Sequence, residues 1–130
     1  MLMQEENRIS YDIRGCAFKV HKELGPGLFE SVYELALSYE LRQLGYDVKN
    51  QVMIPVVYAS IKMDKGFKSD ILVNDKVIIE VKSVEDLKNL YYKQLLNYIR
   101  LSKVKLGLLI NFNTSFLKDK ESIVRMINEF

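Results

Sequence analysis

Three charged residues, Asp70, Glu80 and Lys82, lie in two short runs, 70–73 and 77–82, that are otherwise apolar. A few polar residues separate the runs, which is typical of a β-hairpin. Side chains alternate between the two faces of a strand, so Glu80 and Lys82 should share one face. Two acids beside a lysine are a combination that can bind a metal ion and stabilise charge on a phosphate.

Two registers are open for this hairpin. A two-residue turn at positions 74 and 75 would place Asp70 opposite Ile79 and mix the polar and apolar faces. A three-residue loop at 74–76 instead pairs Asp70 with Glu80 and leaves one face wholly apolar. We favour the three-residue loop, because a slip of one residue would expose the apolar set to solvent. It predicts two carboxylates side by side.

Carboxylates that face each other across neighbouring strands repel, and burying each ion costs several kcal/mol unless a positive charge lies nearby. A divalent cation would remove this conflict. Carboxylate oxygens, a backbone carbonyl and water are the hard ligands that Mg²⁺ or Mn²⁺ takes, and Mg²⁺ keeps waters that a phosphate-bearing substrate can replace. The alternative is an edge strand whose charges only prevent aggregation.

The order and spacing of Asp70, Glu80 and Lys82 resemble the PD-(D/E)XK nuclease superfamily, in which the acids bind metal and the lysine assists phosphodiester hydrolysis. Residues 27–33, GLFESVY, match the G-x-x-E-x-x-Y signature of a small prokaryotic family in that superfamily. Further matches within residues 10–115 are segments 21–28, 36–41, 94–98 and 107–112, and Gln51. The resemblance implies an α/β fold of the restriction-endonuclease type, a three-layer α/β/α sandwich around a mixed four-stranded sheet.

The resemblance also implies roles outside the hairpin. Glu30 would be a third acidic group that reaches the metal directly or through water; alternatively, it only complements the dipole of its helix. Gln94 and Tyr98 resemble the Q-x-x-x-Y pair beside the active site in the RecB branch of the superfamily, and would contact nucleic acid unless they are exposed and inert. Lys68 stands where this family is expected to have arginine, and would meet a phosphate as a point charge.

The composition fits a single domain over residues 1–130. The chain is 48% apolar, which is enough for one core, and its two prolines and lack of low-complexity tracts give no sign of a linker. We find no signal peptide or transmembrane run, and expect a soluble, cytoplasmic protein that does not bind membranes. Cys16 and His21 are the only residues of their types, so we interpret both as structural.

The charge of the chain is weak evidence on its own. A net charge of +2 is too small to identify a nucleic-acid-binding protein. Residues 62–105, however, carry ten Lys or Arg against six Asp or Glu. If a metal ion neutralises Asp70 and Glu80, this region becomes more attractive to phosphates. The alternative is a solvated surface whose lysines serve solubility.

Hydrophobic periodicity predicts the order helix, helix, three strands, helix, strand, helix. The predicted helices cover residues 10–24, 29–44, 87–101 and 120–128, and the predicted strands 48–58, 66–73, 77–82 and 107–112. In the second helix, the expected apolar stripe consists of Val32, Leu35, Ala36 and Tyr39. We interpret Tyr33 as a core residue rather than a catalytic one.

We therefore expect a Mg²⁺- or Mn²⁺-dependent phosphodiesterase that acts on nucleic acid, with DNA as the leading candidate. The expected site consists of Asp70, Glu80 and the Val81 carbonyl as metal ligands, Lys82 to assist attack by a metal-bound water, and Glu30 and Gln94 to complete it. The competing hypothesis is a nucleic-acid- or protein-binding module on a nuclease scaffold that does no chemistry. In a chain this short, a homodimer or a protein partner would have to supply specificity.

Overall fold

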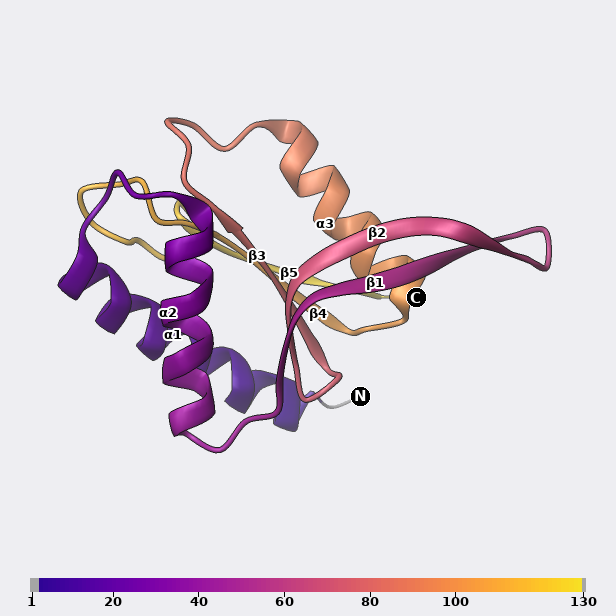
Figure 1. Ribbon diagram of the computed structural model, residues 1–130, viewed down its shortest axis with the longest axis horizontal. Helices are drawn as coiled ribbons and strands as arrows, with labels where there is room; N and C mark the ends of the chain where they lie inside the picture. Colours follow the sequence, from indigo (N-terminus) through magenta and orange to yellow (C-terminus); the bar gives the residue numbers. More distant parts are fainter. Residues whose placement is uncertain (1–2, 130) are drawn as a thin grey trace.

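A five-stranded mixed sheet forms the centre of the fold in residues 3–129, which the computed structural model describes (Figure 1). The strand order is β1-β2-β3-β4-β5; β3 and β4 run parallel, and the other neighbours run antiparallel. Within these residues, no helix has both the length and the apolar content needed to cross a membrane. In chain order the elements are α1 (Gln4–Leu24), α2 (Glu30–Gln43), β1 (Val48–Tyr58), β2 (Ile61–Val73), β3 (Val77–Lys82), α3 (Asn89–Ser102), β4 (Leu106–Asn111) and β5 (Ile123–Ile127).

The helices lie on both faces of the sheet, so the fold has three layers (Figure 1). Ile79 and Val81 of β3 belong to the core beneath α1 and α2. Ile78, the residue before Ile79, points to the opposite face, where it packs with Leu95 and Ile99 of α3. This α/β/α sandwich confirms the predicted fold class.

The hairpin between β2 and β3 has the register that we favoured from the sequence. Ile71 pairs with Ile79 and Val73 with Val77, which leaves residues 74–76 as the connecting loop. The first two loop residues, an asparagine and an aspartate, have left-handed backbone with φ of 51° and 55°. Short polar side chains of these two types tolerate that conformation, so the loop suits its sequence.

The last element of the chain differs from the prediction. Residues 120–128 do not form a helix; Ile123–Ile127 is strand β5, antiparallel to β4, and the sheet has five strands rather than four. Apolar residues at 123 and 127 fit both periods, and so short a run cannot distinguish a helix from a strand. The edge of β4 decides the outcome, because its backbone groups need partners and β-branched residues fit a strand well.

The buried side of α2 also differs from the prediction. Tyr33, Leu37 and Leu41, each one turn apart, are fully buried. Three of the four residues of the expected stripe are instead exposed, namely Val32 (40%), Leu35 (66%) and Tyr39 (59%). Ala36 is half-buried. Both sets have helical spacing, so only the packing partners of α2 separate them.

Tyr33 provides the contacts that orient α2. Its ring stacks on that of Phe112, with 4.6 Å between the centroids. Its hydroxyl donates a hydrogen bond to the Gly25 carbonyl at 2.5 Å and accepts one from the Leu28 N–H at 3.1 Å. The prediction that Tyr33 is a core residue is confirmed. Its place in the G-x-x-E-x-x-Y motif has a physical reason, because Tyr33 fixes the loop between α1 and α2.

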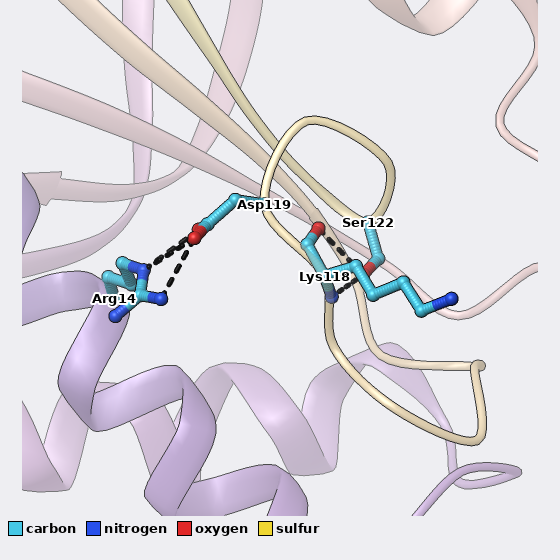
Figure 2. A network of polar contacts seen from close by, with 4 residues as sticks. All are labelled: Arg14, Lys118, Asp119 and Ser122. Atoms are coloured by element: carbon cyan, nitrogen blue, oxygen red, sulfur yellow. Dashed lines mark hydrogen bonds and ion pairs between the residues drawn. The ribbon is translucent and has the colours of Figure 1, made fainter.

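The connection from β4 to β5 is held against α1. Arg14 pairs with Asp119 through two hydrogen bonds, from Nε to Oδ1 and from Nη2 to Oδ2, both 2.8 Å (Figure 2). The Lys118 N–H donates to Ser122 Oγ at 2.7 Å and closes the turn before β5. An exposed ion pair contributes at most about 1 kcal/mol, so its main effect is to orient the loop.

We expect Tyr33→Phe to lower the free energy of unfolding by about 1–2 kcal/mol, because the Gly25 carbonyl and the Leu28 N–H lose a partner while the ring stacking remains. Urea denaturation measures this loss. Tyr39→Phe, at an exposed tyrosine of the same helix, is the matched control and should change the free energy by less than about 0.5 kcal/mol. Equal stability of the two variants would contradict this role for the hydroxyl.

Candidate functional site

Asp70 of β2 and Glu80 of β3 lie where these two strands stop pairing. The backbone ladder between the strands ends at Ile71 and Ile79. At the next position, the Asp70 N–H donates to Glu80 Oε2 at 3.1 Å, and the Val81 N–H donates to Asp70 Oδ2 at 2.9 Å. Each carboxylate thus accepts a bond that a strand carbonyl would otherwise accept. The two acids are neighbours, as the favoured register predicts.

Glu80 and Lys82 project from the face of β3 that α3 covers. Glu80 is 8% exposed and Lys82 is half-buried. The Lys82 ammonium lies over the ring of Tyr91, 4.4 Å from its centroid. A cation over the face of an aromatic ring is attracted to it, so Tyr91 fixes the direction in which the lysine extends. Sequence reasoning did not assign Tyr91 to a contact with Lys82.

The acid pair is electrostatically unfavourable when both groups are charged. Burial, and then the negative charge of Asp70, raise the pKa of Glu80 to about 8. The hydrogen bond from the Asp70 N–H and the positive charge of Lys82 act in the opposite direction but do not outweigh these two effects. Near neutral pH, Glu80 therefore holds a proton unless a cation approaches the pair.

The donor atoms at this position suit a hard divalent cation. Asp70 and Glu80 supply carboxylate oxygens, and a nearby backbone carbonyl such as that of Val81 is also a hard ligand. Within residues 3–129, no three or more His, Cys, Asp and Glu side chains are grouped closely enough to hold a metal ion. A cation at this site would therefore need carbonyl, water or substrate oxygens besides the two carboxylates, which is common for Mg²⁺.

Glu30 reaches the end of β3 from the other side of the sheet. Its Oε2 accepts a hydrogen bond from the Ser83 N–H at 3.3 Å, one residue beyond Lys82. The Ser83 hydroxyl donates to the Leu28 carbonyl at 2.6 Å. This bond joins the loop between α1 and α2 to the end of β3. The glutamate of the G-x-x-E-x-x-Y motif thus accepts a backbone hydrogen bond from the residue that follows Lys82.

Glu34, one turn after Glu30 on α2, is a candidate that sequence reasoning missed. The Gln51 amide donates to Glu34 Oε1 at 2.8 Å and to Asp70 Oδ1 at 3.3 Å, and so links the two acids. Burial raises the pKa of Glu34, and the charges of Asp70 and Glu30 add to this effect. The i, i+4 spacing of the two glutamates was the available signal, because it places both on one helix face.

Gln51 has an unusual backbone for a strand residue, with φ of 52°. Side chains normally alternate along β1, yet Asn50 and Gln51 both donate to the carboxylate of Glu34, at 3.0 and 2.8 Å. The left-handed conformation breaks the alternation and lets consecutive side chains turn the same way. Such a backbone costs on the order of 1–3 kcal/mol in a residue other than glycine, and residues of this kind cluster at functional sites.

Tyr98 of α3 lies within the electrostatic influence of the acid pair. Burial, followed by the negative charges of Glu80 and Asp70, raises its pKa. Its ring stacks on that of Phe67 of β2, with 4.0 Å between the centroids. Gln94 is half-buried and lies between Tyr91 and Tyr98 on the same side of the helix, since the three are spaced i, i+3 and i+7.

Lys68 is exposed on β2, two residues before Asp70, and pairs in the sheet with Met53. It therefore lies at the junction between the acid pair and the outer part of the β1–β2 hairpin. The structure thus brings Asp70, Glu80, Lys82 and Tyr98 together most directly, while Glu30 and Lys68 lie at the margins.

A surface hollow of about 490 Å³ lies elsewhere, between the β3–α3 and β4–β5 connections. Asn111 lines it, but the amide is already engaged: Oδ1 accepts from the Val84 N–H at 3.1 Å, and Nδ2 donates to the Val84 carbonyl at 3.0 Å. Neither Asp70, Glu80 nor Lys82 lines this hollow. The chemistry of the side chains, rather than the size of a hollow, locates the candidate site.

Comparisons with known proteins agree with this geometry. A family model described as the PD-(D/E)XK nuclease superfamily matches residues 7–126. Among solved structures, the crystal structure of SSO0001 is similar with a TM-score of 0.55 at 17% identity, and the match covers 78% of this chain and 51% of that one. This likeness concerns the fold alone, and the chain spans about half the length of SSO0001. Among curated proteins, the comparison found no match.

We expect the metal-free protein to lose stability as the pH rises from about 5 to 8, because Glu80 has a pKa of about 8 when folded and an ordinary value of 4.5 when unfolded. In this window the unfolded chain releases a proton that the folded protein keeps, so deprotonation favours unfolding. Glu80→Gln removes this effect. Its free energy of unfolding should therefore rise relative to wild type across the window, by up to a few kcal/mol.

Urea denaturation in EDTA at a series of pH values measures the difference. Glu23→Gln, at an exposed glutamate of α1, is the control and should follow the wild-type profile. A constant offset between Glu80→Gln and wild type from pH 5 to 8 would contradict the raised pKa.

Proposed function

The chain belongs to the PD-(D/E)XK nuclease superfamily, and on that basis we propose that it is a metal-dependent nuclease that hydrolyses phosphodiester bonds in DNA. The observation that carries this proposal is a pair of hydrogen bonds at the point where β2 and β3 separate: the Asp70 N–H donates to Glu80, and the Val81 N–H donates to Asp70. These bonds hold two carboxylates together beside a lysine, in the order that the superfamily uses.

Within the superfamily, we assign the chain to the G-x-x-E-x-x-Y family. Two hydrogen-bonding patterns give the motif a role consistent with this assignment. Tyr33 binds the loop before α2, and Glu30 binds the Ser83 N–H directly after the E-x-K segment. The motif therefore joins α2 to the end of β3, where the candidate lysine lies.

Asp70, Glu80 and the Val81 carbonyl would hold the metal ion, which we propose to be Mg²⁺ or Mn²⁺. When bound, such an ion supplies a nucleophilic water and neutralises charge on the scissile phosphate. Superfamily nucleases generally use divalent metals, and the acid pair here, with Glu80 buried and Asp70 half-buried, favours a cation for its own electrostatic reasons. Glu34 and Gln51 keep Asp70 oriented through the amide that bridges the two carboxylates.

Lys82 would stabilise the negative charge that develops on the phosphate. The Tyr91 ring supports this role, because it holds the ammonium over its face without neutralising it. Gln94 and Tyr98, on the same side of α3, would bind the nucleic acid next to the reacting phosphate. Lys68 would contact a phosphate of the nucleic acid on the other side of Asp70.

A nucleic-acid- or protein-binding module without catalysis is the second candidate function. The observation that favours it is the small number of acidic ligands, since residues 3–129 contain no group of three or more that could hold a metal ion. Such a module would bind DNA without metal and would show no metal-dependent cleavage. The intact trio of Asp70, Glu80 and Lys82 favours the enzyme.

We expect Asp70→Asn to abolish Mn²⁺ binding and to reduce cleavage of labelled DNA by on the order of 100-fold or more, because the site loses one of its two carboxylates. Calorimetry measures binding, with and without a short non-cleavable DNA, and gel assays measure cleavage. Asp75→Asn, at an exposed aspartate of the β2–β3 loop, is the matched control. Most of the activity persisting in Asp70→Asn would rule out this assignment.

We also expect the ring of Tyr91, and not its hydroxyl, to support Lys82. Tyr91→Phe keeps an aromatic face and should keep kcat near the wild-type value. Tyr91→Leu removes the face and should lower kcat about 3- to 30-fold, in line with a partly desolvated cation–π contact. Steady-state cleavage at saturating Mn²⁺ compares the two variants. Equal losses in both variants would show that the hydroxyl or simple packing matters instead.

A further inference from the structure

The outer part of the β1–β2 hairpin, residues 52–68, projects beyond the body of the molecule; we name it the arm (Figure 1). β3 pairs with β2 only at residues 71–73, so the arm is a two-stranded ribbon with no third strand. Its tip is the turn at Ala59 and Ser60, where φ is 50° and 67°. Positive φ at both positions is typical of the type I′ turn, which continues the twist of a hairpin.

The base of the arm is specifically built. Phe67 stacks on Tyr98 of α3, which joins the ribbon to the helix beside the acid pair. Opposite Pro55, Gly66 comes so close to the other strand that an added Cβ would lie 2.0 Å from the Ile54 carbonyl oxygen. The pairing becomes irregular between Pro55 and Val57, as at a β-bulge. Bulges bend and twist a ribbon, so this position sets the direction of the outer arm.

Val52 and Ile54 at the base of the arm pack with the α3 core, but the outer half of the arm gains little from burial. Val57 is 60% exposed, Ile61 62% and Tyr58 71%, although all three are large and apolar. An isolated two-stranded ribbon is at best marginally stable in water, so its own packing does not account for its length. Apolar side chains at the end of a projecting ribbon are typical of a surface that contacts another molecule.

The charge of the arm indicates the chemistry of that molecule. Its three lysines, Lys62, Lys65 and Lys68, and its single Asp64 give a net charge of +2, which equals the net charge of the whole chain. All three lysines are exposed, and none of them takes part in the ion pairs found in residues 3–129. The lysines therefore remain available for an anionic partner.

The lysines also lie at a useful distance from the candidate site. Lys68 is two residues from Asp70 on the same strand, and Lys62 lies six residues farther out, or about 20 Å along an extended strand. This length corresponds to about six base pairs of duplex DNA. A two-stranded ribbon is also one of the elements that the major groove can admit.

From the charge, the exposure and the connection to Asp70, we infer that the arm is a β-ribbon that binds duplex DNA. Lys62 and Lys65 contact phosphates, and the apolar tip lies against the groove. Contacts along the arm hold the duplex so that a backbone phosphate reaches Asp70 and Glu80. This inference rests on the proposed function, but it concerns binding, which is measured separately from cleavage.

The test is fluorescence anisotropy with a short labelled duplex in EDTA, over a range of salt concentrations. The variant Lys62→Ala with Lys65→Ala should lower the affinity, and the slope of log K against log salt should become shallower by about 1.8, since each phosphate contact contributes about 0.9. Lys19→Ala with Lys118→Ala changes the net charge equally on α1 and the β4–β5 connection. This control should retain the wild-type slope.

Three results would overturn the inference: a wild-type protein that does not bind duplex, equal loss of binding in both double variants, or an arm variant that keeps the wild-type slope. A dimer that Tyr58→Asp disrupts, with no effect on DNA binding, would also overturn it by assigning the arm to a second copy of the chain. Cleavage assays separate the two proposals. Arm-dependent binding without cleavage in Mg²⁺ or Mn²⁺ would uphold the arm and reject the nuclease.

Discussion

The candidate site depends on two hydrogen bonds from backbone N–H groups to carboxylates, which replace the strand pairing at the point where β2 leaves β3. Up to Ile71 and Ile79 the strands pair through their backbones; one residue farther, the carboxylates of Asp70 and Glu80 accept the bonds instead. Because the backbone N–H groups of Asp70 and Val81 keep partners, β2 can diverge from the sheet without leaving buried donors unpaired. The same two hydrogen bonds hold the acids side by side and allow β2 to continue outward with β1.

The two helical layers then supply different groups to the acid pair. From the α2 layer, Glu34 reaches Asp70 through the amide of Gln51, and Glu30 binds the end of β3. From the α3 layer, Tyr91 holds the ammonium of Lys82. The cores beneath these two layers lie on opposite faces of the sheet, and groups from both layers reach the acids where β2 and β3 stop pairing. An anionic substrate that reaches the pair would therefore meet groups from both layers.

Local patterns predicted some of this arrangement well. Alternation with period two fixed the hairpin register, since only one pairing leaves a wholly apolar face, and the structure has that pairing. The same patterns failed at Ile123–Ile127, where the apolar spacing fits a helix as well as a strand, and on α2, where two helical stripes compete. In both places a partner elsewhere in the chain decides the structure. The edge of β4 makes residues 123–127 a strand, and Phe112 takes the ring of Tyr33 and so decides which face of α2 is buried.

The sequence by itself determined the chemical groups of the candidate site and their order, because Asp70, Glu80 and Lys82 lie in one hairpin whose register follows from local alternation. It also determined the superfamily, and with it the layered fold. Only the tertiary structure decided that Glu34, Gln51 and Tyr91 surround these groups. They come from α2, β1 and α3, and contacts between residues far apart in the chain leave no periodic signal. Such contacts arise only when the layers pack against the sheet.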